Sequence, residues 1–208
     1  MSSKQFFNEV AGEWDSMRAN FYSEGVREKA FDRAGVRAGQ VAADLGAGTG
    51  FITEGLLRRG LSVVAVDQSE AMLAKMRTKF QGAGDRVDYR AGEAESLPLA
   101  DDSVEHVFAN MYLHHVDDPS RAVAEMARIL RPGGRLTITD VFEHPFEFLK
   151  TEHHDRWLGF RRDALEEWLT AAGLHEVAVD DLGEECRVRS EGTGETALMN
   201  IFVATGRK

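Results

Sequence analysis

Short apolar runs alternate along the chain with stretches in which apolar residues recur every three or four positions. Several of the runs are apolar at consecutive positions, which is typical of strands in a sheet that is covered on both faces. The pattern therefore predicts about seven strands, over residues 40–45, 61–67, 86–92, 104–113, 134–141, 175–182 and 197–206.

Helical periodicity fills the intervals between these runs. One helix begins after Ser69, a residue type that caps helix N-termini, and another carries Pro119 in its first turn. Gly60 provides a stop for an earlier helix. We predict helices over residues 51–60, 69–80, 119–131 and 161–173.

A strand followed by a helix, repeated over about 100 residues, produces βαβ units with parallel strands and helices on both faces. The first 38 residues read as helix without a strand and are expected to cap one end of the sheet. The last two strands, separated by the Gly- and Glu-rich segment 183–196, are expected to close the sheet as an antiparallel pair. The predicted fold class is α/β: a Rossmann-like doubly wound sheet, mostly parallel, with an antiparallel last strand.

The length and charge of the chain narrow the range of possible functions and partners. A chain of 208 residues, 43% hydrophobic, can bury about 70% of the surface of its unfolded form, so we expect a single domain over residues 1–208. The net charge of −10 argues against nucleic acid or an anionic membrane as the main partner. Cys186 is the single cysteine, which excludes an intramolecular disulfide. Without an apolar signal-peptide core or membrane span, we expect a cytoplasmic location.

The segment "VAADLGAGTGF" places glycine at positions 46, 48 and 50, between a predicted strand and a predicted helix. Such a turn lets backbone amides approach a partly anionic ligand at the helix N-terminus. The dinucleotide fingerprint G-x-G-x-x-G is missed, because Phe51 stands where its third glycine belongs. This disfavours a nicotinamide-dependent oxidoreductase. The alternative interpretation of the turn is a tight connection that binds nothing.

Two acidic residues support the interpretation that this turn binds a ligand. Asp67 ends the second predicted strand, 17 positions after Gly50, where a carboxylate can accept hydrogen bonds from both hydroxyls of a ribose. Glu93 follows the third predicted strand and is placed to bind an exocyclic amine such as that of adenine. An ordinary exposed glutamate is the alternative for Glu93.

Together, "DLGAGTG", "AVDQSEAMLAKM", "AGEAESLPLADDSVEHV", "NMYLHHVDDPSRAVAEMARILRPGGRL" and the N-terminal "FFNEVAGEWD" resemble the class I S-adenosylmethionine-dependent methyltransferases. The resemblance is to the branch that includes the ubiquinone/menaquinone biosynthesis C-methyltransferases. It covers residues 6 to 142 with five motifs in the expected order. It implies a helical cap over residues 1–38, a cofactor-binding core over 39–141, and an acceptor-side region with closing strands over 142–208.

The resemblance also implies a cofactor site for S-adenosylmethionine and its product S-adenosylhomocysteine. Asp67 matches the ribose-binding acid, Asn110 lies near the methionyl group, and Trp14 or Tyr22 is expected to cover the cofactor as a lid. Glu93 departs from the commoner Asp or Asn beside adenine. The remaining residues of the expected site are Asp44, Gly46, Ala47, Gly48, Thr49, Gly50, Gln68, Met72 and Ala94.

Methyl transfer from a sulfonium needs alignment and exclusion of water, and a general base only if the acceptor must lose a proton. Candidates for acceptor chemistry are the two histidine pairs, His114–His115 and His153–His154; His144 and Asp155 are further candidate bases. Each pair has a plainer interpretation, as packing residues or a solvated loop. Metal binding by "TEHHD" is a further alternative, but we predict no metal site.

We therefore expect a methyltransferase acting on a small-molecule acceptor, with no nucleic-acid partner and no membrane insertion. The sequence leaves a monomer and a homodimer both open. A noncatalytic module that binds S-adenosylmethionine or S-adenosylhomocysteine is the main alternative, because the binding residues would be the same; the oxidoreductase is the weaker one.

Overall fold

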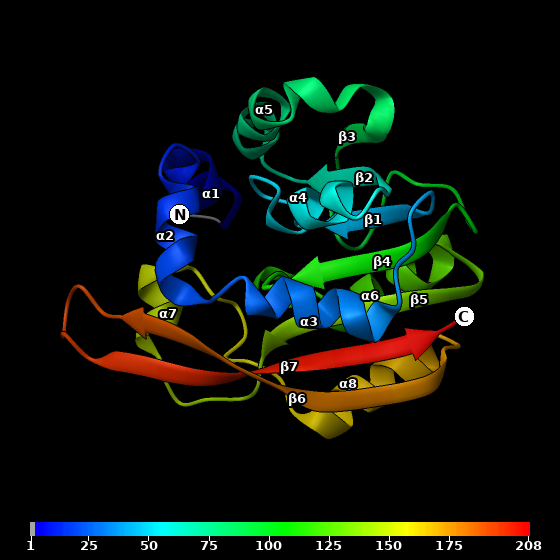
Figure 1. The fold of residues 1–208 in the computed structure, drawn as a ribbon. Coiled ribbons are helices and arrows are strands. Elements are labelled where there is room, and N and C mark those ends of the chain that lie inside the picture. The colour runs from blue at the N-terminus through cyan, green and yellow to red at the C-terminus, as the bar shows by residue number, and fades with distance from the viewer. Residues whose placement is uncertain (1–2) are drawn as a thin grey trace.

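The computed structural model describes residues 3–208 and has a seven-stranded sheet at its centre (Figure 1). The strands are β1 (Val41–Leu45), β2 (Ser62–Asp67), β3 (Val87–Ala91), β4 (Val104–Asn110), β5 (Leu130–Val141), β6 (His175–Arg189) and β7 (Thr196–Arg207). Their order across the sheet is β3-β2-β1-β4-β5-β7-β6. The strands from β3 to β5 run parallel, and β7 is antiparallel to both of its neighbours, which confirms the predicted fold class.

Helices cover both faces of this sheet. They are α1 (Ser3–Val10), α2 (Trp14–Phe21), α3 (Gly25–Ala34), α4 (Phe51–Arg58), α5 (Glu70–Lys79), α6 (Pro119–Ile129), α7 (Phe148–Glu152) and α8 (Arg162–Ala171), with the short 3-10 helices η1 (Gln81–Arg86) and η2 (Leu113–His115). The Ser69 hydroxyl accepts a hydrogen bond from the Met72 amide at 3.1 Å, so the predicted N-cap of α5 is confirmed.

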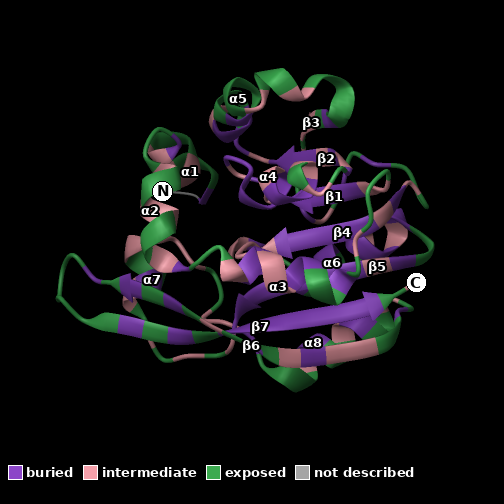
Figure 2. Cartoon of the chain, in the orientation of Figure 1, coloured by how far each residue is buried: buried purple, intermediate pink, exposed green. Residues whose placement is uncertain are grey.

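The core lies in layers above and below the sheet, whose strands are largely buried (Figure 2). Apolar side chains of α3 and α4 pack on one face, and those of α6 and α8 pack on the other. Ala42, Ala43 and Leu45 of β1 are fully buried, as expected for a central strand covered on both sides. The N-terminal helices are confirmed, although α3 covers a face of the sheet rather than its end.

The structure corrects three boundaries. β5 begins at Leu130 rather than at residue 134. β4 ends at Asn110 rather than at residue 113, because Met111 has a φ of +47° and turns the chain out of the extended region before η2. β6 continues to Arg189, through much of the segment interpreted as a connection. A register irregularity between Asp181 and Glu185 allows the strand to continue and to bury Cys186 and Val188.

The strand order reverses at β1, since β2 lies on one side of it and β4 on the other. In open parallel sheets, ligands bind beyond the carboxyl ends of the strands at such a reversal. In Figure 1 the arrowheads of β1, β2 and β4 point toward α1 and α2. No helix within residues 3–208 is both long enough and apolar enough to cross a membrane.

Candidate functional site

A pocket opens beyond the ends of β1, β2 and β4, with about 650 Å³ of empty space that includes its solvent-open mouth. The lining includes most of the residues expected to bind the cofactor: Trp14, Tyr22, Asp44, Gly46, Ala47, Gly48, Thr49, Asp67, Gln68, Met72 and Asn110. We refer to this space as the cofactor pocket.

Three expected cofactor residues lie outside that lining. Glu93 and Ala94 line an adjoining hollow that shares Gln68, Tyr112 and His115 with the cofactor pocket. This position is compatible with a ligand that extends from one space into the other. Gly50 instead starts α4, and a Cβ atom there would lie 2.4 Å from the Phe80 ring.

The three glycines of the turn serve different purposes, although all have a positive φ. A Cβ atom on Gly46 would lie 2.2 Å from the Tyr112 ring, and one on Gly50 would lie 2.4 Å from the Phe80 ring. Rings of the protein itself therefore fill the space beside these two glycines. A Cβ atom on Gly48 would meet only the Trp14 indole, at 3.5 Å. Gly48 is therefore the glycine of the three whose missing side chain leaves room below the lid.

Asp67 is fixed at the end of β2 by two backbone amides. Its Oδ2 accepts a hydrogen bond from the Gly48 amide and its Oδ1 accepts one from the Ser69 amide, both at 2.8 Å. Burial raises its pKa, and these amide hydrogen bonds oppose the change. Because each carboxylate oxygen has two lone pairs, both keep capacity for ligand hydroxyl groups.

Asp44 joins β1 to α4. Its Oδ2 accepts hydrogen bonds from the amide and the hydroxyl of Thr53, at 3.0 and 2.7 Å. Burial raises the pKa of Asp44 to about 7, against the opposing effect of the Thr53 hydrogen bonds. Its bonds to Thr53 make Asp44 a support for the turn as well as a residue of the pocket lining.

The N-terminal helices are tied to the floor of the pocket by two side-chain hydrogen bonds. The Thr49 hydroxyl donates to Asp15 Oδ1 at 2.6 Å, and the Ser69 hydroxyl donates to Asn8 Oδ1 at 2.6 Å. Trp14 lies over Gly48 in the same arrangement. Trp14 and Tyr22 both line the cofactor pocket, and their role as a lid stays a prediction.

Arg18 is a pocket residue that the sequence interpretation missed. It lies on α2 between Trp14 and Tyr22, four positions from each, so the three residues share one face of the helix and its C-terminal extension. Its guanidinium carbon lies 4.2 Å from the centre of the Phe51 ring. This spacing of four was the sequence signal that connects Arg18 to the two predicted lid residues.

A second pocket adjoins the first and shares Phe7, Trp14, Tyr22, Met111 and His115 with it. It contains about 550 Å³ of empty space, again including its open mouth. The lining is mainly apolar and aromatic, and its ionisable side chains are Tyr22, His114, His115, His153, Asp155 and Cys186. We call this space the acceptor pocket.

His114 is held between two carboxylates. Its Nδ1 lies 2.6 Å from Asp140 Oδ1, and its Nε2 lies 3.8 Å from Asp155 Oδ1. Burial alone would lower the pKa of His114, but the charges of Asp140 and Asp155 outweigh burial and raise it to about 9. Burial raises the pKa of Asp155 to about 6, and the charge of His114 opposes this effect.

His115 has the opposite character. Burial, together with the neighbouring charge of His114, lowers its pKa well below the ordinary value. At neutral pH, His114 is therefore charged and His115 is neutral. Because His115 lines both pockets, it provides a neutral imidazole at their junction.

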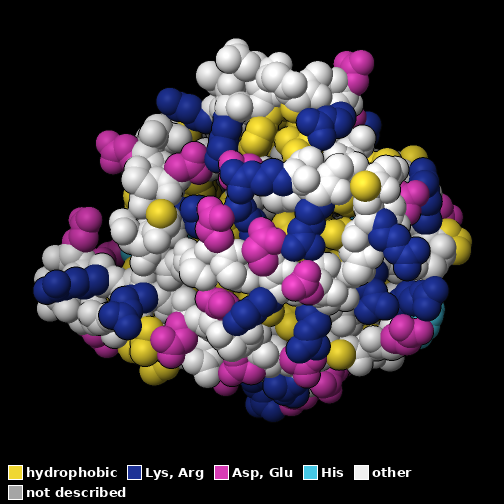
Figure 3. Space-filling view, in the orientation of Figure 1, with side chains coloured by type: hydrophobic (Ala, Val, Ile, Leu, Met, Phe, Trp, Pro, Cys, Tyr) yellow, Lys and Arg dark blue, Asp and Glu magenta, His cyan; other side chains and the backbone are white. Residues whose placement is uncertain are grey.

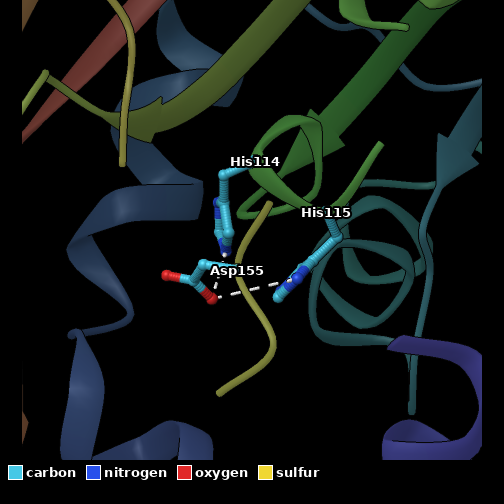
Figure 4. A group of neighbouring side chains, drawn as sticks. All are labelled: His114, His115 and Asp155. Carbon is cyan, nitrogen blue, oxygen red and sulfur yellow. Dashed lines mark ion pairs between the residues drawn. The ribbon is translucent and has the colours of Figure 1, made fainter. Parts of the chain in front are cut away.

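Figure 4 shows His114 and His115 converging on Asp155. One donor atom from each lies within 4.8 Å of the others, so these are the described residues that can together hold a metal ion. A charged imidazole has no lone pair for a metal, and two carboxylates favour that form of His114. Without a metal ion, the two carboxylates therefore favour a proton on His114, and the absence of a metal site stays a prediction.

The other predicted histidines occupy different positions. His153 lines the acceptor pocket, where burial lowers its pKa, while the ring of His154 packs 5.1 Å from that of Phe6. The backbone oxygen of His154 lies 3.4 Å from His115 Nδ1. His144 lines neither pocket. Of the pair His153–His154, only His153 thus borders the acceptor pocket.

Comparisons with known proteins agree with this architecture. Residues 43–138 match a family model described as a methyltransferase domain. A ubiquinone/menaquinone biosynthesis C-methyltransferase of Hahella chejuensis is 35% identical over 158 residues, which is 72% of this chain and 63% of that protein. The chain spans about half the length of the curated relatives at the head of this comparison.

Solved structures share the fold. A putative methyltransferase of Haloferax volcanii, in complex with a Trm112 methyltransferase activator, superposes with a TM-score of 0.79 at 23% identity, covering 97% of this chain and 96% of that one. Phosphoethanolamine N-methyltransferase 2 of Haemonchus contortus, in complex with S-adenosyl-L-methionine, superposes with a TM-score of 0.70 at 20% identity, covering 88% of this chain and 52% of that one.

Proposed function

Because this chain belongs to the class I S-adenosylmethionine-dependent methyltransferases, in the branch that includes the ubiquinone/menaquinone biosynthesis C-methyltransferases, we propose that it methylates a small-molecule acceptor. The methyl donor is S-adenosylmethionine, which leaves as S-adenosylhomocysteine. Membership of this family argues against the nicotinamide-dependent oxidoreductase considered from the sequence.

The residues of the cofactor pocket fit this donor. Gly48 leaves open space beneath Trp14, and both Asp67 oxygens have remaining acceptor capacity beside it. We assign the ribose to Asp67, the adenine to the hollow beside Glu93 and Ala94, and the methionyl end to the side of the pocket lined by Asn110. The Asn110 amide donates to the Tyr22 hydroxyl at 3.2 Å, which joins the lid to β4 at that end.

One observation carries the proposal: the cofactor pocket and the acceptor pocket meet along a shared wall that contains Met111 and His115. When bound, S-adenosylmethionine supplies an electrophilic methyl group on a sulfonium. The chain must then hold an acceptor in line with that group and exclude water. The aromatic lining from α1 and α2 is placed to do both.

His115 is our candidate for the proton acceptor. Its neutral imidazole borders both pockets, so an acceptor in contact with the methyl group would also reach its ring. His114, charged and fixed by Asp140, is placed to favour the anionic form of an acceptor that has lost its proton. An acidic hydroxyl or carbon acid in an apolar molecule matches this combination.

A small acceptor also agrees with the surface and the net charge of −10. On the face shown in Figure 3, Asp and Glu side chains are scattered among the Lys and Arg side chains. We propose that the chain works as one domain in the cytoplasm, with free Cys186 buried in the acceptor pocket.

The test uses S-adenosylmethionine labelled on its methyl group, mixed with separated small-molecule, protein and nucleic-acid fractions of cell extract. We expect label in the small-molecule fraction, and at least tenfold less with His115→Gln, since general acid-base groups contribute about 10²- to 10⁴-fold. His175→Gln, at an exposed position, is the control. Label in the protein or nucleic-acid fraction would contradict the proposal. Tight cofactor binding without any transfer would favour the noncatalytic module.

A further inference from the structure

The guanidinium of Arg18 faces the cofactor pocket without a partner for two of its nitrogen atoms. Nε and Nη1 are buried and have no hydrogen-bond partner within residues 3–208. The Phe51 ring lies 4.2 Å away and the Tyr22 ring 5.5 Å away, so the contacts around the charge are mainly aromatic. Buried N–H groups are almost always hydrogen-bonded, and a buried charge is normally paired.

Arg27, on the next helix, is fully buried and provides a comparison. Its guanidinium forms ion pairs with Glu24 and Glu54 and donates a hydrogen bond to the Phe51 backbone oxygen. Arg27 thus has protein partners on several sides, whereas Arg18, which packs against the same Phe51 ring, has none for Nε and Nη1. The contrast indicates that the partner of Arg18 is a ligand.

The other residues of the cofactor pocket indicate which part of the ligand Arg18 contacts. The amides and carboxylate beside Gly48 and Asp67 suit a ribose, whereas Arg18 is grouped with Tyr22 and Asn110 at the methionyl end. An arginine fork matches a planar carboxylate through two parallel hydrogen bonds. We infer that Arg18 binds the carboxylate of the amino-acid end of S-adenosylmethionine or S-adenosylhomocysteine, and that this contact secures α1 and α2 over both pockets.

The second half of this inference follows from where Arg18 stands. It belongs to α2, and α1 and α2 supply Phe6, Phe7, Trp14 and Phe21 to the wall of the acceptor pocket. A carboxylate held by Arg18 therefore bridges the ligand to the helices that complete the acceptor pocket. Cofactor would bind first and order that wall. The inference rests on the proposed function, because it needs an adenosyl ligand in the pocket.

Two ligands that differ at the amino-acid end test it. S-adenosylhomocysteine carries the carboxylate, whereas 5′-methylthioadenosine retains the adenosyl group and sulfur but lacks it. Measured by calorimetry, the affinity for S-adenosylhomocysteine should fall by about 10- to 100-fold in Arg18→Met, the usual range for a hydrogen bond to a charged group. The affinity for 5′-methylthioadenosine should change by less than about twofold. Arg37→Met, at an exposed position beyond α3, should change neither.

Hydrogen exchange measures the coupling to the helices. In the unsubstituted protein, S-adenosylhomocysteine should slow amide exchange over residues 3–22 more than saturating 5′-methylthioadenosine does. In Arg18→Met the two ligands should give the same protection. The melting temperature of unliganded Arg18→Met should stay level or rise, because the change removes two buried N–H groups that lack partners.

The outcomes separate the two proposals. If neither ligand binds the unsubstituted protein, the proposed function fails. If both bind and Arg18→Met weakens them equally, or weakens neither, the carboxylate assignment is wrong while the adenosyl site stands. Equal protection by both ligands in the unsubstituted protein would overturn the coupling to α1 and α2.

Discussion

At the scale of single residues, the site depends on polar groups that the backbone holds in place before a ligand arrives. Both oxygens of Asp67 accept amide hydrogen bonds, and His114 is fixed through Nδ1 by Asp140. Groups fixed in this way lose little conformational freedom when a ligand binds. Their contribution can therefore be measured by substitutions that remove the charge.

Asp67→Asn tests the ribose assignment. The amide keeps one acceptor oxygen, loses the negative charge and turns its NH2 group toward the Gly48 or Ser69 N–H, so cofactor affinity should fall by at least about 1.5 to 3 kcal/mol, or about 10- to 150-fold. Calorimetry with S-adenosylhomocysteine measures the change. Asp88→Asn, at an exposed position on β3, is the matched control and should bind normally. Unchanged affinity in Asp67→Asn would remove Asp67 from the ribose site.

The charge on His114 predicts a pH dependence of stability. Its folded-state pKa of about 9 lies above the ordinary histidine value of about 6.5, so its stabilising effect is complete below pH 6.5. The effect is lost as the pH rises through about 9, at a cost of roughly 3 kcal/mol.

Urea unfolding between pH 6.5 and 9.5 measures this dependence. The free energy of unfolding should fall with pH in the unsubstituted protein, and His114→Asn should remove most of the slope. His175→Asn, at an exposed position on β6, should keep it. A slope that His114→Asn leaves unchanged would show that other groups cause it.

At the scale of elements, hydrophobic periodicity predicts the strands and helices well because most of them bury one face or both. β1 and β2 carry apolar side chains on both faces, and α6 buries Val123, Met126 and Ile129 along one stripe. The pattern gave less information where backbone conformation decides the outcome. β4 ends at Asn110 because Met111 has a positive φ, and no apolar pattern signals that turn.

β6 is a second element whose extent the hydrophobic pattern did not predict. Its second half alternates buried and exposed residues around Cys186 and Val188, but Gly183 and several glutamates obscure this pattern in the sequence. The short helix α7 lies in a segment that reads as irregular. Both elements depend on contacts with distant parts of the chain: β6 pairs with β7, and Glu152 of α7 accepts a hydrogen bond from Ser190.

At the scale of the whole molecule, sheet topology brings together residues that are far apart in the chain. The turn after β1, Asp67 and Asn110 meet because parallel strands end at the same edge, and this part of the site was predictable from the sequence. The acceptor pocket was less predictable from the sequence. It combines α1 and α2 with η2 and the β6–β7 hairpin, whose packing on one another no local motif specifies.

Tertiary packing also decides which glycines of the turn leave room for a ligand, and the sequence alone does not show this. Two of its three glycines make room for Tyr112 and Phe80 rather than for a ligand, and only the folded chain shows which two. Arg18 likewise joins the pocket lining only through the packing of α2 over the pocket. Local sequence thus predicted residues along one edge of this pocket, and tertiary structure places α1 and α2 over it.

The most direct test of the account is a crystal structure of the chain with S-adenosylhomocysteine. We predict that the ligand lies beyond the ends of β1, β2 and β4, with both ribose hydroxyl groups on Asp67 and its sulfur facing the wall shared with the acceptor pocket. Density for the ligand at another place, or a ribose that does not contact Asp67, would contradict it.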